Sequence, residues 1–123
     1  MNKKFWIPIV AIVIIAAVLL GFKSAYTNDN SIPYTQAPKH VGQQVTVRGK
    51  IVSTTYRDGT DFLDYCADYT NCPLALVVLD KNTSKFGDVG KYSGNNVRVT
   101  GTVSTYQGRT EIILTNPSQI KLE

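Results

Sequence analysis

The feature that most constrains the fold of this chain is a strand-like pattern that occurs twice. Residues 45–59 read VTVRGKIVSTTYRDG, and residues 97–108 read VRVTGTVSTYQG. Both stretches alternate β-branched and polar residues, as half-buried strands do, and both end in a tyrosine and a glycine turn. Each also has a mid-strand glycine, which is typical of a bulge or a close backbone approach where a strand bends. The repeat therefore predicts two hairpins whose first strands bend at Gly49 and Gly101.

Other segments of the C-terminal part add to this pattern. The expected elements are strands at 44–56, 60–66, 74–79, 97–106 and 110–115, helical turns within 83–92, and a short tail at 120–122. The order β-β-β-α-β-β with bent first and fourth strands is that of the OB-fold, a partly open Greek-key barrel. We therefore expect an all-β fold: a small five-stranded OB-fold barrel with a short helix between the third and fourth strands.

An apolar run precedes this part of the chain. Residues 5–22, FWIPIVAIVIIAAVLLGF, carry no charge. As a helix they would span about 27 Å, close to the hydrocarbon thickness of a bilayer, so we expect one N-terminal transmembrane helix acting as a signal anchor. Lys3 and Lys4 precede the run and only Lys23 follows closely, which favours a cytoplasmic N-terminus and an extracytoplasmic domain. A cleaved signal peptide is the alternative, although neither candidate cleavage point has a small residue three positions upstream.

The chain is thus expected to have three regions. They are a membrane anchor at 1–23, a flexible linker at 24–40 that is polar and contains two prolines, and an OB-fold domain at 41–123. Three of the 13 basic residues flank the apolar run, and ten remain after residue 23 against nine acidic residues. The net charge of +4 therefore mostly reflects the anchor, and it does not by itself indicate a polyanion as partner.

The two cysteines agree with an exported domain. Cys66 and Cys72 lie in DYCADYTNCP, separated by polar, turn-forming residues. We expect a disulfide, which would contribute about 2.4 kcal/mol by closing so short a loop. Free thiols are one alternative. A metal site is another, but two cysteines and the distant His40 do not make a four-ligand zinc set, and we expect no metal.

Two longer stretches are similar to a known family. Residues 40–63 read HVGQQVTVRGKIVSTTYRDGTDFL, and residues 95–123 read NNVRVTGTVSTYQGRTEIILTNPSQIKLE. With their two glycine-containing strands and closing EIIL and PSQI, they resemble the OB-fold nucleic-acid-binding domains of the anticodon-binding, tRNA-anti-like type. The resemblance implies a ligand lying across the second and third strands, framed by the loops joining strands one to two and four to five. It does not identify the ligand, because the shared positions mostly build the barrel.

On such a face, aromatic rings would stack on bases and cations would bind phosphates. The residues that we expect at a nucleic-acid-binding site are Arg48, Lys50, Tyr56, Arg57, Tyr65, Tyr106 and Arg109. Tyr69, Arg98 and Phe62 are further candidates, but either Phe62 or Leu63 must face the core. The matched residues Tyr56 and Tyr106 have an alternative role as structural strand-end residues, and Arg57 and Arg109 as solvated charges at hairpin tips.

An acidic run argues against a polyanion. It comprises Asp58, Asp61, Asp64 and Asp68, and it belongs to the segment where a bound strand would lie. Four carboxylates on that face would repel phosphates. Their spacing does not match a calcium loop, so a solvated face is the simpler interpretation.

Catalysis finds little support in the sequence. There is a single histidine, and no glycine-rich phosphate loop follows a strand and opens a helix. We therefore expect no enzyme and no small-molecule cofactor. Two functions remain: a membrane-tethered extracytoplasmic module that binds single-stranded nucleic acid or a similar oligomer, and a structural barrel that binds a protein or another envelope component without any nucleic-acid role.

Overall fold

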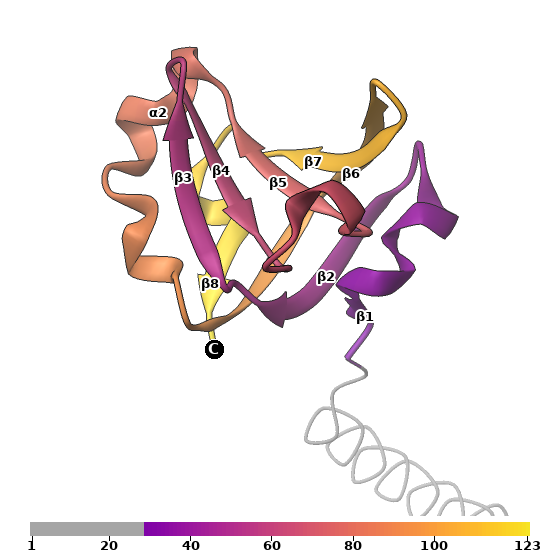
Figure 1. Ribbon diagram of the computed structural model, residues 1–123. Coiled ribbons are helices and arrows are strands. Elements are labelled where there is room, and N and C mark those ends of the chain that lie inside the picture. The colour runs from indigo at the N-terminus through magenta and orange to yellow at the C-terminus, as the bar shows by residue number, and fades with distance from the viewer. Residues whose placement is uncertain (1–28) are drawn as a thin grey trace, which may run out of the picture. The chain divides into compact units, whose positions relative to one another are not determined.

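Eight strands form one strongly curved sheet (Figure 1). In the computed structural model, which describes residues 29–123, the strands are β1 (Ile32–Pro33), β2 (Gln44–Lys50), β3 (Ser53–Arg57), β4 (Thr60–Asp64), β5 (Ala75–Val78), β6 (Asn96–Tyr106), β7 (Arg109–Ile113) and β8 (Ile120–Leu122). The strand order is β1-β2-β6-β7-β5-β4-β3, and β8 also pairs with β6. The expected all-β class is confirmed.

The pairing is that of an OB-fold barrel. β2 and β3 are two halves of one bent first strand, because β2 pairs with β6 and β3 pairs with β4. β4 continues to β5 in antiparallel fashion, and β5 pairs with β7 in parallel. β7 then pairs with β6, which closes the ring back to β2. The expected first strand at 44–56 is therefore interrupted at residues 51–52, where the chain passes from one partner strand to the other.

The helical segment between β5 and β6 packs against the core, as expected. It consists of α2 (Asp80–Phe86) and the 3₁₀ turn η3 (Val89–Tyr92). Phe86, Val89 and Tyr92 are buried and join the cluster of strand residues that fills the barrel. Three further 3₁₀ turns are η1 (Tyr34–His40), η2 (Tyr69–Asn71) and η4 (Pro117–Gln119).

The two mid-strand glycines allow close packing and do not form bulges. Register is unbroken through both positions, since Gly49 pairs with Val97 and Gly101 pairs with Val45. A Cβ atom on Gly49 would lie 2.7–2.9 Å from the rings of two tyrosines, and one on Gly101 would lie 2.6 Å from Cγ2 of Ile112. Of the two alternatives, a bulge and a close approach, the structure shows a close approach, and side chains make it.

Both hairpins turn as the sequence predicted. The β3–β4 hairpin turns at Asp58 and Gly59, with φ of 52° and 82°, and the β6–β7 hairpin turns at Gln107 and Gly108, with φ of 51° and 77°. Positive φ at both central residues defines the two-residue type I′ turn, whose twist matches that of antiparallel strands. These two turns bring their tips to the same face of the barrel, as the lining residues of the cleft described below show.

The folded unit begins at Ser31, earlier than the expected start at Val41. Ala37 is fully buried, and the ring of Tyr34 stacks on that of Tyr65 with centroids 4.4 Å apart. These side chains tie η1 to the barrel, so the segment that we expected to be a linker contributes to the core from residue 31 onward. The expected anchor lies outside the described residues, and no helix within residues 29–123 is long and apolar enough to cross a bilayer.

Candidate ligand-binding cleft

A cleft of about 230 Å³ lies on the face made by β3, β4, β5 and the β6–β7 hairpin. Its middle is formed by Phe62 of β4 and Val77 of β5, which pair in register. Its rim is formed by Arg57 at the first hairpin and by Tyr106 and Arg109 at the second. This is the location that the resemblance implied, across the second and third barrel strands and between the two hairpin loops.

Both rim arginines are held by aromatic rings. The guanidinium of Arg57 lies 4.8 Å from the ring centroid of Phe62, and that of Arg109 lies 5.3 Å from the centroid of Tyr69. Nη2 of Arg109 also donates a hydrogen bond to the carbonyl oxygen of Tyr69 at 2.6 Å. Cation–π contacts of this kind restrict the guanidinium groups, so these two exposed charges are positioned at the cleft.

The disulfide loop supplies the ring of Tyr69. Cys66 and Cys72 are bonded, with Cα atoms 5.6 Å apart, which confirms the expected pairing. Between them, the carboxylate of Asp68 accepts a hydrogen bond from the backbone N–H of Thr70 and caps η2. The hydroxyl of Thr70 donates to the same carboxylate, and these two hydrogen bonds lower the pKa of Asp68 below its usual range. The disulfide therefore closes the loop, Asp68 caps the 3₁₀ turn within it, and the ring of Tyr69 lines the cleft.

Two carboxyl groups also line the cleft. They belong to Asp64 of β4 and Glu111 of β7, which sit on either side of Ala75 in one row across the sheet. Burial raises the pKa of Asp64, against the opposing effects of Arg109 and Arg57. Burial also raises the pKa of Glu111, and Arg109 again opposes the shift. The cleft thus contains two cations near its rim and two partly desolvated acids near its floor.

The two matched tyrosines have different surroundings. Tyr106 lines the cleft and is 62% exposed, so one face of its ring is accessible to a ligand. Tyr56 is 66% exposed but is not among the lining residues. Strand alternation explains this, because its neighbours Thr55 and Arg57 face the cleft and Tyr56 must face the other way. Only Tyr106 of this pair is placed to stack on a ligand in the cleft.

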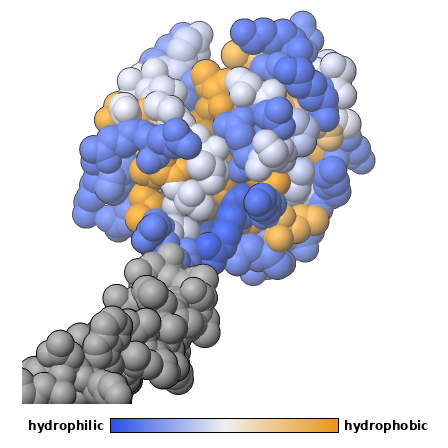
Figure 2. Space-filling model, turned by 180° about the vertical axis from the view of Figure 1, so that it is seen from behind, coloured by the Kyte–Doolittle hydropathy of each residue, from blue (hydrophilic) through white to orange (hydrophobic). Residues whose placement is uncertain are grey.

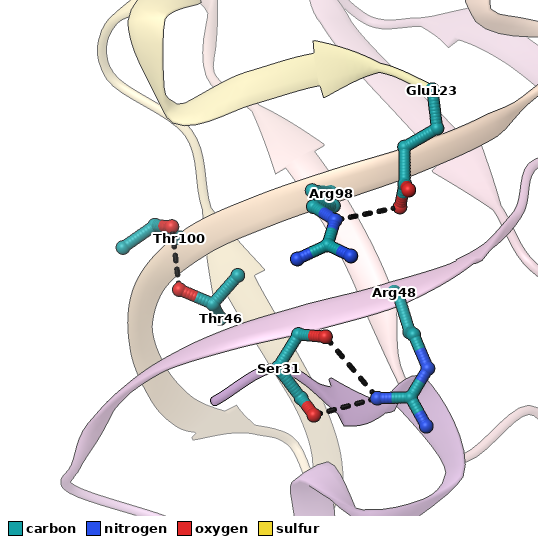
Figure 3. Close-up of polar contacts among 6 residues, drawn as sticks. All are labelled: Ser31, Thr46, Arg48, Arg98, Thr100 and Glu123. Atoms are coloured by element: carbon teal, nitrogen blue, oxygen red, sulfur yellow. Dashed lines mark hydrogen bonds and ion pairs between the residues drawn. The ribbon is translucent and has the colours of Figure 1, made fainter. Parts of the chain in front are cut away.

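Arg48 and Lys50 lie on β2, away from the cleft. Nη1 of Arg48 donates to the carbonyl oxygen of Ser31 at 2.6 Å (Figure 3). Its cross-strand partner Arg98 forms an ion pair with Glu123 at 2.9 Å. Arg48 and Arg98 thus each have a polar partner on the β2–β6 face. The structure therefore brings together only Arg57, Tyr106 and Arg109 of the seven expected site residues.

Tyr65 was expected to contact a ligand, but this prediction conflicts with its burial. The side chain is 3% exposed, packs against Tyr34 and has a hydroxyl group without a hydrogen-bond partner in the described part of the chain. Burial and the nearby Tyr34 raise its pKa above the usual tyrosine range. Tyr65 is a core residue. Phe62, by contrast, lines the cleft and Leu63 is the fully buried one, which resolves the alternative left open by the pattern.

The acidic run does not form one surface. Asp64 lines the cleft, whereas Asp61 alternates to the opposite side of β4, where burial and the nearby Asp88 raise its pKa. Asp68 caps η2, and Asp58 occupies the first hairpin turn. Only one of the four expected repulsive charges therefore faces the site. Among residues 29–123, no group of three or more histidine, cysteine or acidic side chains is placed to hold a metal ion.

Sequence reasoning missed Glu111, and it named Tyr69 as a candidate without its contact with Arg109. The alternation of side chains along a strand could have indicated Glu111, because it lies two residues from Arg109 and therefore faces the same side of β7. Asp64 likewise shares the side of Phe62 on β4. Alternation does not predict that β5 pairs with β7 in parallel. This pairing brings segments more than thirty residues apart into one cleft.

No protein-family model matches this sequence, and the comparison with curated proteins gave no match. Solved structures match at low identity. A putative aspartyl-tRNA synthetase from Leishmania major Friedlin has a TM-score of 0.56 and 14% identity, over 85% of this chain and 25% of the synthetase. The aspartyl-tRNA synthetase from Entamoeba histolytica has a TM-score of 0.53 and 13% identity, over 80% of this chain and 22% of that one.

A third match covers nearly the whole of the other protein. OBody AM1L10, in its structure bound to hen egg-white lysozyme, has a TM-score of 0.54 and 17% identity, over 78% of this chain and 95% of the OBody. The chain thus corresponds to about a quarter of the length of each synthetase and to almost all of the OBody. At these identities the likeness concerns the fold alone, and that fold is the OB-fold.

Proposed function

We propose that the cleft binds a short single-stranded nucleic acid or a chemically similar oligomer. The observation that carries this proposal is the convergence of three aromatic side chains and two positioned arginines on one concave face. Stacking of bases on rings and pairing of phosphates with guanidinium groups are how single strands are bound without sequence preference. The fold agrees, since OB-folds bind oligonucleotides and oligosaccharides on this face. The synthetase matches add only that the same fold occurs in proteins that act on tRNA.

The charge of the domain limits how such a ligand is bound. Ten basic and nine acidic residues follow position 23, so no broad positive field covers the molecule. Two arginines at the rim of the cleft are then the main phosphate contacts. Most of the binding free energy must come from stacking and hydrogen bonding, and little of it from counterion release.

A salt titration tests this proposal. For single strands, log K falls with log salt by about 0.7 per phosphate contact, so two contacts predict a slope of about −1.4. Fluorescence anisotropy of a labelled single-stranded octamer, measured from about 50 mM salt upward, gives the slope. Failure to detect binding at about 50 mM salt would contradict the proposed function.

Matched variants test whether the salt dependence of binding arises from the arginines of the cleft. Arg57→Gln and Arg109→Gln should each bring the slope to about −0.7, because each removes one phosphate contact. Lys50→Gln removes the same charge from β2, away from the lining residues, and should leave the slope unchanged. An equal effect of all three variants would show that binding reports only the net charge.

We also propose that residues 5–22 anchor the protein and that the domain is extracytoplasmic. The uncharged run, the lysines before it and the disulfide support this location, since disulfides persist in oxidising compartments. Alkaline phosphatase, which is active only after export, should be active when fused to the C-terminus. An inactive fusion that accumulates to normal levels would contradict the topology.

A protein ligand is the second candidate function. Asp64 and Glu111 would accept a lysine or arginine side chain in the cleft, and the OBody is an OB-fold protein bound to lysozyme. On the face shown in Figure 2, apolar residues form separate patches among hydrophilic ones, unlike the continuous patches typical of large protein interfaces. A cationic peptide that competes for the cleft while no oligonucleotide binds would favour this second function.

A further inference from the structure

The floor of the cleft is a row of three residues from adjacent strands. Asp64 of β4 pairs with Ala75 of β5, which pairs with Glu111 of β7. Neighbouring strands lie about 4.8 Å apart, so the two acidic residues are separated by about 9.6 Å at their backbones. Ala75 between them is small, which leaves room above the row for part of a ligand. We call this row the floor of the cleft, and its two acids flank one small residue.

Asp64 is a buried acceptor that faces the cleft without a partner. Its exposure is 9%, and within residues 29–123 its carboxylate makes no hydrogen bond or ion pair. Because burial removes part of the hydration of this carboxylate, a ligand in the cleft that donates hydrogen bonds to it replaces the lost water contacts. Burial raises the pKa of Asp64, and the positive charges of Arg109 and Arg57 oppose that shift. Asp64 is therefore poised to accept hydrogen bonds from a ligand.

Glu111 is a second hydrogen-bond acceptor on the floor, so it also favours a ligand that donates hydrogen bonds. Its side chain lines the cleft and is partly buried, and burial raises its pKa as it does for Asp64. A phosphate group placed on this floor would meet two acceptors and no donor from either acid. The part of a ligand that reaches the floor is therefore rich in N–H donors, and its phosphates lie toward the arginines at the rim.

The size of the cleft suits one planar ring system. Its volume of about 230 Å³ is smaller than the roughly 300–1,000 Å³ of pockets that hold drug-sized molecules. Phe62 and Val77 supply apolar surface at its middle, and Tyr106 supplies an exposed ring at its edge. A single base fits this volume, and it can stack on Tyr106 while its polar edge points toward the acids of the floor.

Guanine matches this floor better than the other bases. Its Watson–Crick edge presents two adjacent donors, N1–H and the N2 amino group, which fit the two oxygens of one carboxylate. Adenine and cytosine present one amino group beside an acceptor nitrogen. Thymine and uracil present one N–H between two carbonyl oxygens, which a carboxylate repels.

We propose, on the basis of the proposed function above, that the cleft has a guanine-selective subsite in which Asp64 accepts hydrogen bonds from N1–H and N2–H. Glu111 is a second acceptor at the same floor, and Tyr106 stacks on the base. The preference concerns one base in an otherwise tolerant single strand, because only one such floor lies between the two hairpins in the described domain.

The test uses octamers of thymidine in which one central position is guanine, inosine, adenine, cytosine or thymine. A single guanine avoids the four-stranded structures that guanine runs form. Anisotropy titrations with the full-length chain, kept in detergent because of its apolar N-terminal run, should show about tenfold tighter binding of the guanine octamer than of the thymine octamer. Inosine lacks the N2 amino group, so its octamer should bind between these two.

Two aspartates of β4 form a matched pair of variants. Asp64→Asn replaces one acceptor oxygen by a donor and should abolish the preference for guanine. The guanine octamer should bind more weakly, and the thymine octamer should bind more tightly because the carboxylate that repels its carbonyl oxygens is gone. Asp61→Asn alters an equally buried carboxyl group, 7% exposed, on the opposite side of the same strand, and should retain the preference. Near-UV circular dichroism of both variants checks that the barrel is intact.

The outcomes separate this inference from the proposed function. Equal affinity for all five octamers would overturn the guanine subsite and leave oligonucleotide binding in place. A guanine preference that survives Asp64→Asn would also overturn it, since the donors would then be recognised elsewhere. Absence of binding by any octamer at low salt would overturn both, whereas a preference lost only with Asp64→Asn supports the subsite.

Discussion

At the scale of single residues, the barrel depends on the missing side chain of Gly101. A Cβ atom there would lie 2.6 Å from Cγ2 of Ile112, a fully buried residue that cannot move aside without disturbing the core. Overpacking of this kind costs about 1–3 kcal/mol. Gly101→Ala should therefore lower the unfolding free energy by about that amount in urea denaturation.

A control on the same strand isolates this effect. Thr102→Ala changes an exposed neighbour and should shift the unfolding free energy by less than about 0.5 kcal/mol. If Gly101→Ala were as mild as Thr102→Ala, the contact between the two strands would be looser than described. The pattern predicted a requirement for glycine here, but it attributed it to a bend, and the contact with Ile112 joins residues that only the fold brings together.

At the scale of elements, the disulfide loop links stability to the cleft. It holds Tyr69 against Arg109, and its closure should contribute about 2.4 kcal/mol to stability. The double variant Cys66→Ala/Cys72→Ala should lose that amount in urea denaturation. It should also bind a thymidine octamer several-fold more weakly, because Tyr69 is then free to leave the wall of the cleft.

Tyr69→Ala with the disulfide intact separates the two effects. It should weaken binding to a similar degree while most of the stability is retained, because Tyr69 is 44% exposed and is not part of the core cluster. Undiminished affinity in both variants would show that the loop has only a structural role. The disulfide itself was predictable from two cysteines in a polar segment, whereas the contact of its loop with Arg109 was not.

The elements could be predicted from the sequence more fully than the site. Alternation and turn residues identified both hairpins, the helical segment and the five barrel strands, the first of them without its interruption, because these features depend on local residue patterns. The cleft combines side chains from β3, β4, β5 and β7, and its acids are desolvated only after those strands meet. Burial of this kind depends on pairing between distant segments, so Asp64 was predicted as a repulsive surface charge and Glu111 was overlooked.

At the scale of the whole molecule, the near balance of charges after residue 23 distinguishes this domain from strongly basic nucleic-acid-binding proteins. Its cations are dispersed: Arg48 and Arg98 have partners on the β2–β6 face, and only Arg57 and Arg109 border the cleft. A ligand is therefore selected by the shape and hydrogen bonding of one concave face. Binding through this face, and not through overall charge, is the central claim about how the molecule works.

The paired substitutions Tyr106→Ala and Tyr56→Ala test this claim most directly. The two tyrosines end matched strands and are exposed to nearly the same extent, 62% and 66%, but only Tyr106 lines the cleft. Anisotropy titration of a thymidine octamer at fixed salt should show a loss of about 1–3 kcal/mol for Tyr106→Ala and no loss for Tyr56→Ala. Equal losses, or an unchanged affinity of Tyr106→Ala, would contradict binding in the cleft.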